Sequence, residues 1–365
     1  MKVELVHDWL ITEGGAEKVL KALSEMFPGP IHTLFYDPKV LQNPFFLDKE
    51  IHTSFLQKCP FATKNHRWLF PLFPHAIESL DLSQAEVILS SSHAVAKGVI
   101  KREDQLHICY CHTPMRYAWD LKEDYLKSCP PLLRSSAGFL LERIRKWDQK
   151  GALRVDAFIA NSLHVAKRIK THYKRDSTVI YPPVRVDQFF IASQKEEYYI
   201  THARLVPYKR IDLWVEAFAR MPDKKLIVIG DGPEKEKLKR LAKKNVEFLG
   251  FVGDKELSLL LSKAKAYLFA AEEDFGIAVV EAQAAGLPIL ALKKGGVLET
   301  TVEGKSALFF EEATLASCVE VIYSFEKKED FFDADWIRKS VLKFGELRFH
   351  EEISAFIEEQ KKGFL

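Results

Sequence analysis

Residues 273–282 read Glu-Asp-Phe-Gly-Ile-Ala-Val-Val-Glu-Ala, and they lie between an apolar run at 266–271 and the sequence Ala-Ala-Gly-Leu-Pro at 284–288. This order predicts a buried strand, an acidic glycine turn, and a helix that begins near Phe275 and ends at a glycine before the next strand. Such a helix directs unpaired N–H groups, and about half a unit of positive charge, at the space beyond the strand. The stretch therefore predicts a phosphate site.

Two carboxylates, Glu273 and Glu281, flank this predicted site. They would repel a phosphate, but they accept hydrogen bonds from hydroxyl groups beside it, such as those of a sugar and a ribose joined by a pyrophosphate. The spacing, Glu-x7-Glu with Phe-Gly between, resembles the signature of retaining GT-B glycosyltransferases of family four. We therefore expect Glu273 at the transferred sugar, Glu281 at the ribose, and Phe275, Gly276 and Ile277 at the diphosphate.

Length and composition set broad limits on the fold and on the partners. The 365 residues exceed the size at which one core usually keeps growing, so two domains are expected. A formal charge of +2 and the absence of a recognition motif argue against nucleic acid. No apolar run is long enough for a membrane span, and the start of the chain leads into a strand rather than a signal peptide, which predicts a cytoplasmic protein. The five cysteines, an odd number without zinc-type spacing, predict reduced thiols.

Strands and helices alternate along the chain, which predicts α/β architecture with parallel sheets wound on both faces. The expected strands of the first half are 2–6, 31–35, 87–91, 106–111, 157–160 and 178–181, with a helix at 16–26. The two prolines at 182–183 forbid helix and central strand, so they mark a linker. The expected strands of the second half are 198–202, 226–229, 246–251, 266–270, 288–291 and 307–310, and 336–360 has helical composition.

The pattern and the resemblance together predict two Rossmann-like domains, 1–183 and 184–344. In the GT-B fold these domains face each other across a cleft, with the acceptor in the first and the nucleotide-sugar in the second. The last helix of that fold commonly returns to the first domain. The resemblance therefore implies that the segment at about 345–365 packs there.

The turn after the first strand contains Gly14 and Gly15, which allow close approach of the backbone to a ligand. The turn is not a Gly-x-Gly-x-x-Gly fingerprint, which argues against a dinucleotide dehydrogenase. On its own the pair fits a plain tight turn equally well. Gly-Gly-Ala-Glu-Lys is, however, similar to the Gly-Gly-Ala-Glu-Arg loop that faces the cleft in family-four transferases.

Two histidines follow predicted strands of the first half. His112 ends the strand at 106–111 and precedes Thr-Pro-Met-Arg, so it is expected beyond the carboxyl end of the sheet, where ligands bind. A histidine that caps the turn is the structural alternative. The string resembles that of family members that use GDP-mannose or related donors, in which the histidine contacts the transferred sugar. His93 fits an acceptor contact and a structural role equally well.

In the second half, Arg204 and Lys209 come just after the first strand. A guanidinium grips phosphate oxygens with two parallel N–H groups and an ammonium supplies a movable charge, so together they can neutralise a departing diphosphate. The arrangement resembles the family's diphosphate-binding pair. Asp231 lies in a glycine turn at another strand end, and the resemblance places Phe251 and Val252 against the nucleotide base.

The sequence favours a mechanism without a metal ion. The Asp-x-Asp match at 333–335 lies in a polar segment away from the predicted sheets and is interpreted as surface. Arg204, Lys209 and the helix terminus can stabilise the leaving diphosphate without a cation. Because no Ser-His-Asp or Cys-His pattern indicates covalent catalysis, we expect front-face attack, with His112 orienting the sugar.

A basic helix is expected at 139–150, with Leu140, Ile144 and Trp147 at helical spacing among four cations. Packing of this apolar stripe in the core, with a solvated basic face, is the simpler interpretation. The alternative is contact with an anionic membrane, which would place the protein peripherally on the inner face of the cell membrane and suit a polyprenyl-linked acceptor.

The sequence thus predicts a retaining, metal-independent hexosyltransferase that acts on a glycan or lipid-linked saccharide. The motifs look most like mannosyltransferases of surface-polysaccharide assembly, of which lipopolysaccharide is one product, so GDP-mannose is favoured over a UDP-sugar. Two further alternatives remain: a nucleotide-sugar 2-epimerase, which would act without an acceptor, and a non-catalytic GT-B scaffold. Binding of GDP, UDP or ADP would discriminate among these possibilities.

Overall fold

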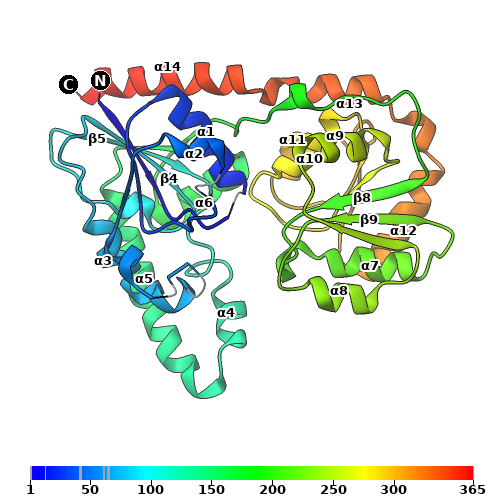
Figure 1. The fold of residues 1–365 in the computed structure, drawn as a ribbon, viewed down its shortest axis with the longest axis horizontal. Helices are drawn as coiled ribbons and strands as arrows, with labels where there is room; N and C mark the ends of the chain where they lie inside the picture. The colour runs from blue at the N-terminus through cyan, green and yellow to red at the C-terminus, as the bar shows by residue number, and fades with distance from the viewer. Residues whose placement is uncertain (1, 13, 41–42, 61, 64–65, 365) are drawn as a thin grey trace. The chain divides into compact units, whose positions relative to one another are not determined.

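The fold was established from a computed structural model, which describes residues 2–12, 14–40, 43–60, 62–63 and 66–364. The chain divides into two compact units (Figure 1). The first comprises residues 1–183 and 349–365, and the second comprises residues 184–348. None of the described helices is long and apolar enough to cross a membrane.

In the described part of the first unit, the strands form one seven-stranded parallel sheet with the order β3-β2-β1-β4-β5-β6-β7. The strands are β1 Val3–His7, β2 Ile31–Thr33, β3 Ile51–Thr53, β4 Val87–Ser92, β5 Leu106–Cys111, β6 Ala157–Ala160 and β7 Thr178–Val179. The central strands are buried on both faces, which explains their nearly continuous apolar sequence.

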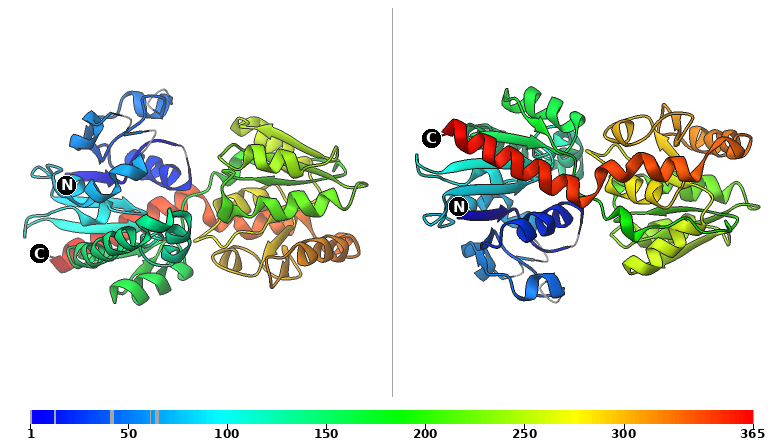
Figure 2. Two further views of the ribbon diagram at one scale, coloured as in Figure 1. Left: turned by 90° about the horizontal axis from the view of Figure 1, so that it is seen from below. Right: turned by 90° about the horizontal axis from the view of Figure 1, so that it is seen from above.

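Helices cover both faces of the first sheet (Figures 1 and 2). The α-helices are α1 Gly15–Met26, α2 Pro44–Leu47, α3 Phe73–Glu78, α4 Lys122–Ser128, α5 Arg134–Leu153, α6 Leu163–Tyr173 and α14 Glu346–Phe364, and the 3₁₀ helices are η2 Phe55–Lys58, η3 His66–Leu72, η4 Ala96–Gly98 and η5 Pro131–Leu133. Alternation along the strands feeds both layers: Leu5 and Leu89 pack with α1 and α14, whereas Val6 and Ile88 pack with α3 and η4. Phe349 and Ile353 of α14 thus belong to the core of the first unit.

The second unit, all of which the structure describes, contains a six-stranded parallel sheet with the order β10-β9-β8-β11-β12-β13. The strands are β8 Tyr198–His202, β9 Lys225–Ile229, β10 Val246–Gly250, β11 Tyr267–Phe269, β12 Ile289–Leu292 and β13 Ala307–Phe310. Its helices are α7 Ile211–Ala219, α8 Lys235–Leu241, α9 Asp254–Lys263, α10 Ile277–Ala284, α11 Val297–Thr300, α12 Leu315–Glu326 and α13 Ala334–Val341, with 3₁₀ helices η6 Val186–Gln188, η7 Pro207–Lys209, η8 Glu329–Phe331 and η9 Leu342–Phe344. A core around Trp214 and Phe218 joins α7, α8 and α12 to one face of the sheet.

The six strands of the second sheet follow the same order as the first six strands of the first sheet. In each sheet, the second and third strands are added on one side of the first strand, and the fourth strand is added on the other side. This change of side lies between β1 and β4 in the first unit and between β8 and β11 in the second. In open α/β sheets, ligands bind beyond the carboxyl ends of the strands at this point. The residues that follow β1, β4, β8 and β11 are therefore the ones expected to contact a ligand.

Several predicted boundaries require correction. The strand expected at 31–35 ends at Thr33, the strand expected at 266–270 covers only Tyr267–Phe269, and β3 was not predicted. The helix expected from Phe275 begins at Ile277, because Gly276 takes the left-handed conformation at φ 87° and breaks the helical path. The helical segment at 336–360 is interrupted after Phe344 by the extended backbone of Gly345.

Candidate functional site

The loop between β11 and α10 forms the first part of the candidate site. Gly276 caps α10 with a positive φ, and its amide and that of Ile277 donate no hydrogen bond to another described residue. Phe275 is buried, and its ring packs edge-on against Phe344 at 5.5 Å, so its side chain anchors the loop. The terminus of α10 therefore leaves two backbone donors beyond the end of β11, while Phe275 contributes structure.

A glycine pair that the sequence analysis missed holds this loop in place. Gly295, at φ 77°, and Gly296 follow β12 and lie directly against the backbone of Glu273 and Asp274. A Cβ atom on Gly295 would lie 2.4 Å from the carbonyl oxygen of Glu273, and the Gly296 amide donates to that oxygen at 2.8 Å. Only glycine permits this approach. The signal was a Gly-Gly pair after a strand, but its partner could not be read from the sequence.

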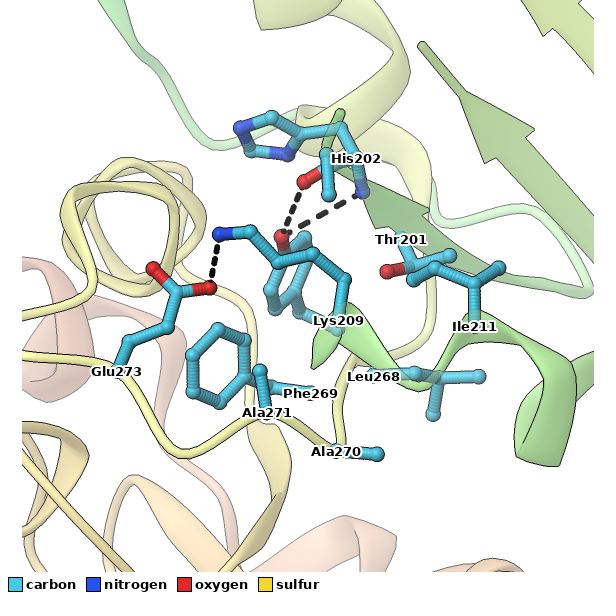
Figure 3. Close-up of a pocket in the computed structure, with 11 residues that line it drawn as sticks. Thr201, His202, Lys209, Ile211, Leu268, Phe269, Ala270, Ala271 and Glu273 are labelled. Carbon is cyan, nitrogen blue, oxygen red and sulfur yellow. Dashed lines mark hydrogen bonds and ion pairs between the residues drawn. The ribbon is translucent and has the colours of Figure 1, made fainter. Parts of the chain in front are cut away.

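Lys209, in η7 after β8, forms an ion pair with Glu273, which follows the neighbouring strand β11 (Figure 3). Both side chains are mostly shielded, with 16% and 18% of their surfaces exposed. They border a cavity of about 10 Å³, room for about one water molecule, that is also lined by Thr201, His202 and the end of β11. The structure thus brings together two residues that the sequence assigned to neighbouring parts of one ligand.

Glu281 lies one helical turn into α10, where it is 5% exposed. Its Oε2 atom is 3.0 Å from Nε2 of His202, the last residue of β8. The hydroxyl of Tyr267 in turn donates to the carbonyl oxygen of His202 at 3.0 Å. The sequence analysis did not identify His202, although it is a polar residue at a strand end, which is the signal that could have revealed it.

The remaining predicted residues of the second unit lie at the carboxyl ends of β8, β9 and β10. Arg204 is exposed and forms no ion pair with another described residue. Asp231 is also exposed, and its carboxylate contacts Lys235 at 2.5 Å and accepts from the Gly232 amide at 2.7 Å. These hydrogen bonds lower the pKa of Asp231. Phe251 is 87% exposed and Val252 is half-buried, so the Phe251 ring is available for stacking.

In the first unit, Asp8 follows β1 and is fully buried. Its two oxygens accept from the backbone amides of residues 93–96 at 2.5 to 3.1 Å. The Nδ1 atom of His93 lies 3.0 Å from Oδ2. Burial acts to raise the pKa of Asp8, but His93 and the amides outweigh it and hold this pKa well below its usual range. The carboxylate of Asp8 therefore fixes the loop after β4, and the structure assigns His93 this structural contact.

His112 lies just beyond β5, where it is 8% exposed. Its Nε2 atom is 2.8 Å from the hydroxyl of Ser91, and its carbonyl oxygen accepts from Asn161 at 2.9 Å. Burial holds the pKa of His112 well below its usual range, with a smaller contribution from His93 and His7. The imidazole is therefore neutral at physiological pH, which suits hydrogen bonding to a hydroxyl group.

The glycine turn closes the cluster of the first unit. Gly14 caps α1, and its amide donates to the buried carboxylate of Glu17 at 2.9 Å, whereas Gly15 is exposed. Glu17 also lies 3.7 Å from Nε2 of His7. The carboxylate joins the loop to the end of β1. The neighbouring Glu13 lies outside the described residues.

Among the described residues, no group of three or more His, Cys, Asp or Glu side chains is arranged to hold a metal ion. Asp333 of the Asp-x-Asp match caps α13 and accepts from the amides of Asp335 and Trp336. Cys109 and Cys111 are buried free thiols. Each of these motifs has a local structural role.

Two family models match the chain, and together they extend over residues 14–340. The model described as Glycosyltransferase Family 4 matches residues 14–188, and the model described as Glycosyl transferases group 1 matches residues 186–340.

The chain is similar to curated proteins over part of its length. It is 38% identical over 121 residues to an alpha-monoglucosyldiacylglycerol synthase of Acholeplasma laidlawii, which covers 30% of each chain. It is 34% identical over 114 residues to a GDP-mannose-dependent monoacylated alpha-(1-6)-phosphatidylinositol monomannoside mannosyltransferase of Corynebacterium glutamicum, which covers 27% of this chain and 30% of that protein. These alignments span about a third of each relative.

Solved structures share the fold over the whole chain. A sucrose-phosphate synthase of Thermosynechococcus elongatus superposes with a TM-score of 0.77 at 14% identity and covers 100% of both chains. The Anabaena protein HepE in complex with UDP-glucose superposes with a TM-score of 0.72 at 17% identity and covers 98% of this chain and 99% of that one. The two parallel sheets with Rossmann-like strand order are those of the GT-B fold.

Proposed function

Because the chain belongs to the group 1 and family 4 glycosyltransferases, we propose that it transfers a hexose from a nucleotide-sugar to a glycan or lipid-linked saccharide. Transfer retains the anomeric configuration and needs no metal ion. The donor binds the second unit and the acceptor binds the first. The observation that carries the proposal lies beyond the adjacent ends of β8 and β11, where Lys209 is paired with Glu273 and the loop after β11 continues to the amides of Gly276 and Ile277.

The diphosphate of the donor provides the charge for which these groups are suited. The α10 terminus supplies N–H donors, and Lys209 and Arg204 supply two cations. Lys209 is paired with Glu273, so donor binding requires the ammonium to share or exchange this partner. Arg204 is exposed and can reach a phosphate without breaking a pair among the described residues. Positive charge from the protein thus takes the place of a cation at the leaving group.

Two carboxylates hold the sugars on either side of the diphosphate. Glu273 accepts a hydrogen bond from a hydroxyl of the transferred hexose, and Glu281 accepts one from a ribose hydroxyl beside its contact with His202. Phe251 and Val252 contact the nucleotide base, and Asp231 lies at the neighbouring strand end. Gly14 and Gly15 allow close approach of the loop after β1 to the substrate, and His112 orients the transferred sugar.

The reaction proceeds on one face of the sugar. The bond from the anomeric carbon to the phosphate oxygen breaks, a bond from the same carbon to the acceptor oxygen forms on that face, and the acceptor proton passes to the departing phosphate oxygen. Because the leaving group takes the proton, no strong side-chain base is required. Arg204, Lys209 and the α10 amides stabilise the negative charge that grows on the diphosphate.

We favour GDP-mannose as the donor. Relatives with GDP-mannose in their names include two mannosyltransferases of Corynebacterium glutamicum, whereas the Anabaena structures contain UDP or UDP-glucose. A UDP-sugar is therefore the alternative within the same fold. A thermal-shift panel of GDP, UDP and ADP, followed by sugar variants of the nucleotide that binds, tests the choice: GDP and GDP-mannose should give the largest shifts in excess EDTA. Absence of a shift with every nucleotide would contradict the proposed function.

An enzyme that acts on a lipid-linked acceptor must reach a membrane. We call the exposed part of α5 and the preceding turn the tip, and its side chains fit a membrane contact. The apolar stripe of Leu140, Ile144 and Trp147 packs in the core of the first unit, so the membrane face considered from sequence is not available. Apolar side chains are exposed instead at Leu132, by 96%, and at Phe139, by 68%.

Exposed cations surround these side chains, namely Lys127, Arg134, Arg143 and Lys146. Exposed apolar groups among cations bind anionic lipid surfaces. We propose that this tip places the protein on the inner face of the membrane.

Sedimentation with vesicles tests the membrane contact. Wild-type protein should pellet with phosphatidylglycerol vesicles but much less with phosphatidylcholine vesicles. Leu132→Ser combined with Phe139→Ser should weaken this binding about tenfold or more. Leu153→Ser, at the other end of α5 and 71% exposed, is the matched control and should bind like wild type. Equal pelleting of the double variant would contradict a role for the tip.

A further inference from the structure

Two serine–histidine pairs join β4 to β5 in the first unit. The Ser90 hydroxyl lies 2.8 Å from Nε2 of His107, and the Ser91 hydroxyl lies 2.8 Å from Nε2 of His112. Since neighbouring strand residues point to opposite faces of the sheet, the pairs lie on opposite faces. Both serines are buried. The pairs differ in one respect: the Ser91 hydroxyl also lies 3.1 Å from Nδ1 of a second imidazole, that of His7.

A hydroxyl between two imidazole nitrogens restricts where their protons lie. Ser91 has one O–H to donate and two lone pairs to accept. It can donate to one ring nitrogen only, so the other must carry a proton and donate to Ser91. Since Ser91 is 1% exposed, water does not readily replace either partner. If Nδ1 of His7 has no proton and accepts from Ser91, then Nε2 of His112 must carry a proton and donate to Ser91.

Glu17 decides the direction of this chain of hydrogen bonds. One carboxylate oxygen lies 3.7 Å from Nε2 of His7, and the other accepts from the Gly14 amide at 2.9 Å. Burial acts to raise the pKa of Glu17, but His7 and the other interactions outweigh it, so the carboxylate is ionised. A negative charge beside Nε2 of His7 favours the tautomer with its proton there. Nδ1 of His7 is then a lone pair that accepts from Ser91.

The remaining proton position follows from this order. Because Ser91 donates to His7, its oxygen accepts from Nε2 of His112, which must carry a proton. Since the His112 imidazole is neutral, its Nδ1 atom is a lone pair. This atom makes no hydrogen bond with another described residue, so it is the nitrogen that a ligand can reach.

We propose that Ser91 is a positioning residue which, with Glu17 and His7, fixes His112 in the Nε2–H tautomer, so that Nδ1 accepts a hydrogen bond from a substrate hydroxyl. This inference rests on the proposed function in that the hydroxyl belongs to the transferred sugar. A hydroxyl that donates to His112 has its oxygen lone pairs free for other donors. A substrate group that can only accept, such as a carbonyl or an ether oxygen, would not be recognised at this position.

The other charged groups near His112 are consistent with a neutral ring. His93 and Asp8 are the nearest besides His7, and they are held together by their own contact at 3.0 Å. Asp8 is occupied by four backbone amides. Neither His93 nor Asp8 forms a hydrogen bond to His112 among the described residues, so Ser91 remains the group that sets its tautomer.

Nitrogen-15 NMR of the full chain with labelled histidine tests the tautomer directly, without substrate. The His112 signal is assigned by its loss in His112→Gln. We expect Nε2 with the shift of a protonated nitrogen and Nδ1 with that of an unprotonated one at neutral pH. Ser91→Ala should convert this single tautomer into a mixture, and Ser91→Thr, which keeps the hydroxyl, should restore it. Protonation of wild-type His112 at Nδ1 would overturn the proposal even if the alanine variant failed to fold.

Ser90→Ala is the matched control, since it removes an equally buried hydroxyl from the same pair of strands. It should change the signals of His107 and leave those of His112 unchanged. In glycosyl transfer, Ser91→Ala should lower kcat about tenfold with KM changed less than about twofold, whereas Ser90→Ala should retain the wild-type values. Equal effects of the two alanine variants would assign Ser91 to structure alone. Failure of wild type to transfer any sugar would contradict the proposed function, while the NMR result would still decide the tautomer.

Discussion

The end of β1 and β4 in the first unit and the end of β8 and β11 in the second occupy the same place in the same strand order, yet they hold polar groups differently. In the first unit, Asp8 and Ser91 are buried and occupied by partners from the same unit. In the second, Arg204 is exposed and Lys209 and Glu273 share one ion pair.

The same strand order thus holds polar groups that are fixed by their partners in the first unit and groups that can exchange partners in the second. Buried, occupied polar groups resist rearrangement, because loss of any partner leaves an unsatisfied group away from water. They are suited to holding a side chain such as His112 in one orientation. Partly exposed charges exchange partners at small cost, which suits a site where a diphosphate arrives and leaves. The proposed function uses this difference: the first unit would orient the substrate and the second would neutralise charge.

The largest expected effect concerns stability. Asp8→Asn places an amide NH₂ opposite backbone N–H donors and removes a buried charge, so the free energy of unfolding of the first unit should fall by about 3–5 kcal/mol. Asp231→Asn, the exposed counterpart in the second unit, should leave the unfolding midpoint unchanged within error. Denaturant unfolding followed by hydrogen exchange in each unit measures both. Equal losses of unfolding free energy in the two variants would contradict this difference between the units.

The next effect concerns turnover. Under the proposed function, Arg204 and Lys209 stabilise charge that grows as the bond between the sugar and the phosphate breaks. Arg204→Ala or Lys209→Ala should therefore slow transfer about 100- to 1,000-fold, with a smaller effect on donor binding. Arg220→Ala, which changes an exposed arginine after α7, is the control and should retain wild-type rates. Activity should persist in excess EDTA. Wild-type rates in the first two variants, or rescue of EDTA-treated enzyme by manganese, would exclude this role.

Acid should destabilise the first unit. His107 is fully buried, and burial lowers its pKa from 6.5 to about 4. The unfolded chain therefore binds a proton at this position below pH 6.5 while the folded chain does not, so stability falls as the pH drops from 6.5 to 4, by at most about 3 kcal/mol. His107→Gln should flatten this part of the pH profile. An unchanged slope in the variant would show that other groups cause the acid sensitivity.

A smaller effect separates the two carboxylates of the second unit. Glu281→Ala should weaken binding of GDP about tenfold, because it removes the proposed ribose contact and leaves His202 without its carboxylate. Glu273→Ala should bind GDP as well as wild type, since it removes the proposed sugar contact and leaves the proposed diphosphate contacts in place, but should lower turnover. Calorimetric titration with GDP, combined with rate measurements, distinguishes them. The reverse pattern would mean that the roles of the two residues are exchanged.

Much of this architecture could be predicted from the sequence, because parallel strands buried on both faces give apolar runs at regular intervals. β2 and β3 both read Ile-His-Thr, but Leu34 and Phe35 continue the apolar run after β2, whereas Ser54 follows β3. β3 therefore escaped prediction because it is a short edge strand without an apolar extension. The start of α10 was placed two residues early because the sequence does not show that Gly276 takes a positive φ.

The contacts within the site were less predictable than its residues. Nothing in the sequence singled out Asp8, because the four amides that it binds come from a loop more than 80 residues away. Likewise, Gly295 meets Glu273 only through the pairing of the loops after β11 and β12. Tertiary contacts of this kind leave no periodic signal.

We propose that the second unit holds the leaving diphosphate while the transfer retains the anomeric configuration. The anomer of the sugar that is released first shows directly whether the configuration is retained. Slow hydrolysis of GDP-α-mannose, with water in place of the unidentified acceptor, can be followed by proton NMR in EDTA before the free sugar equilibrates. We expect α-mannose to appear first, and Lys209→Ala to slow its release about 100-fold or more. Initial release of β-mannose, or a mannosyl adduct trapped on the protein, would contradict front-face transfer.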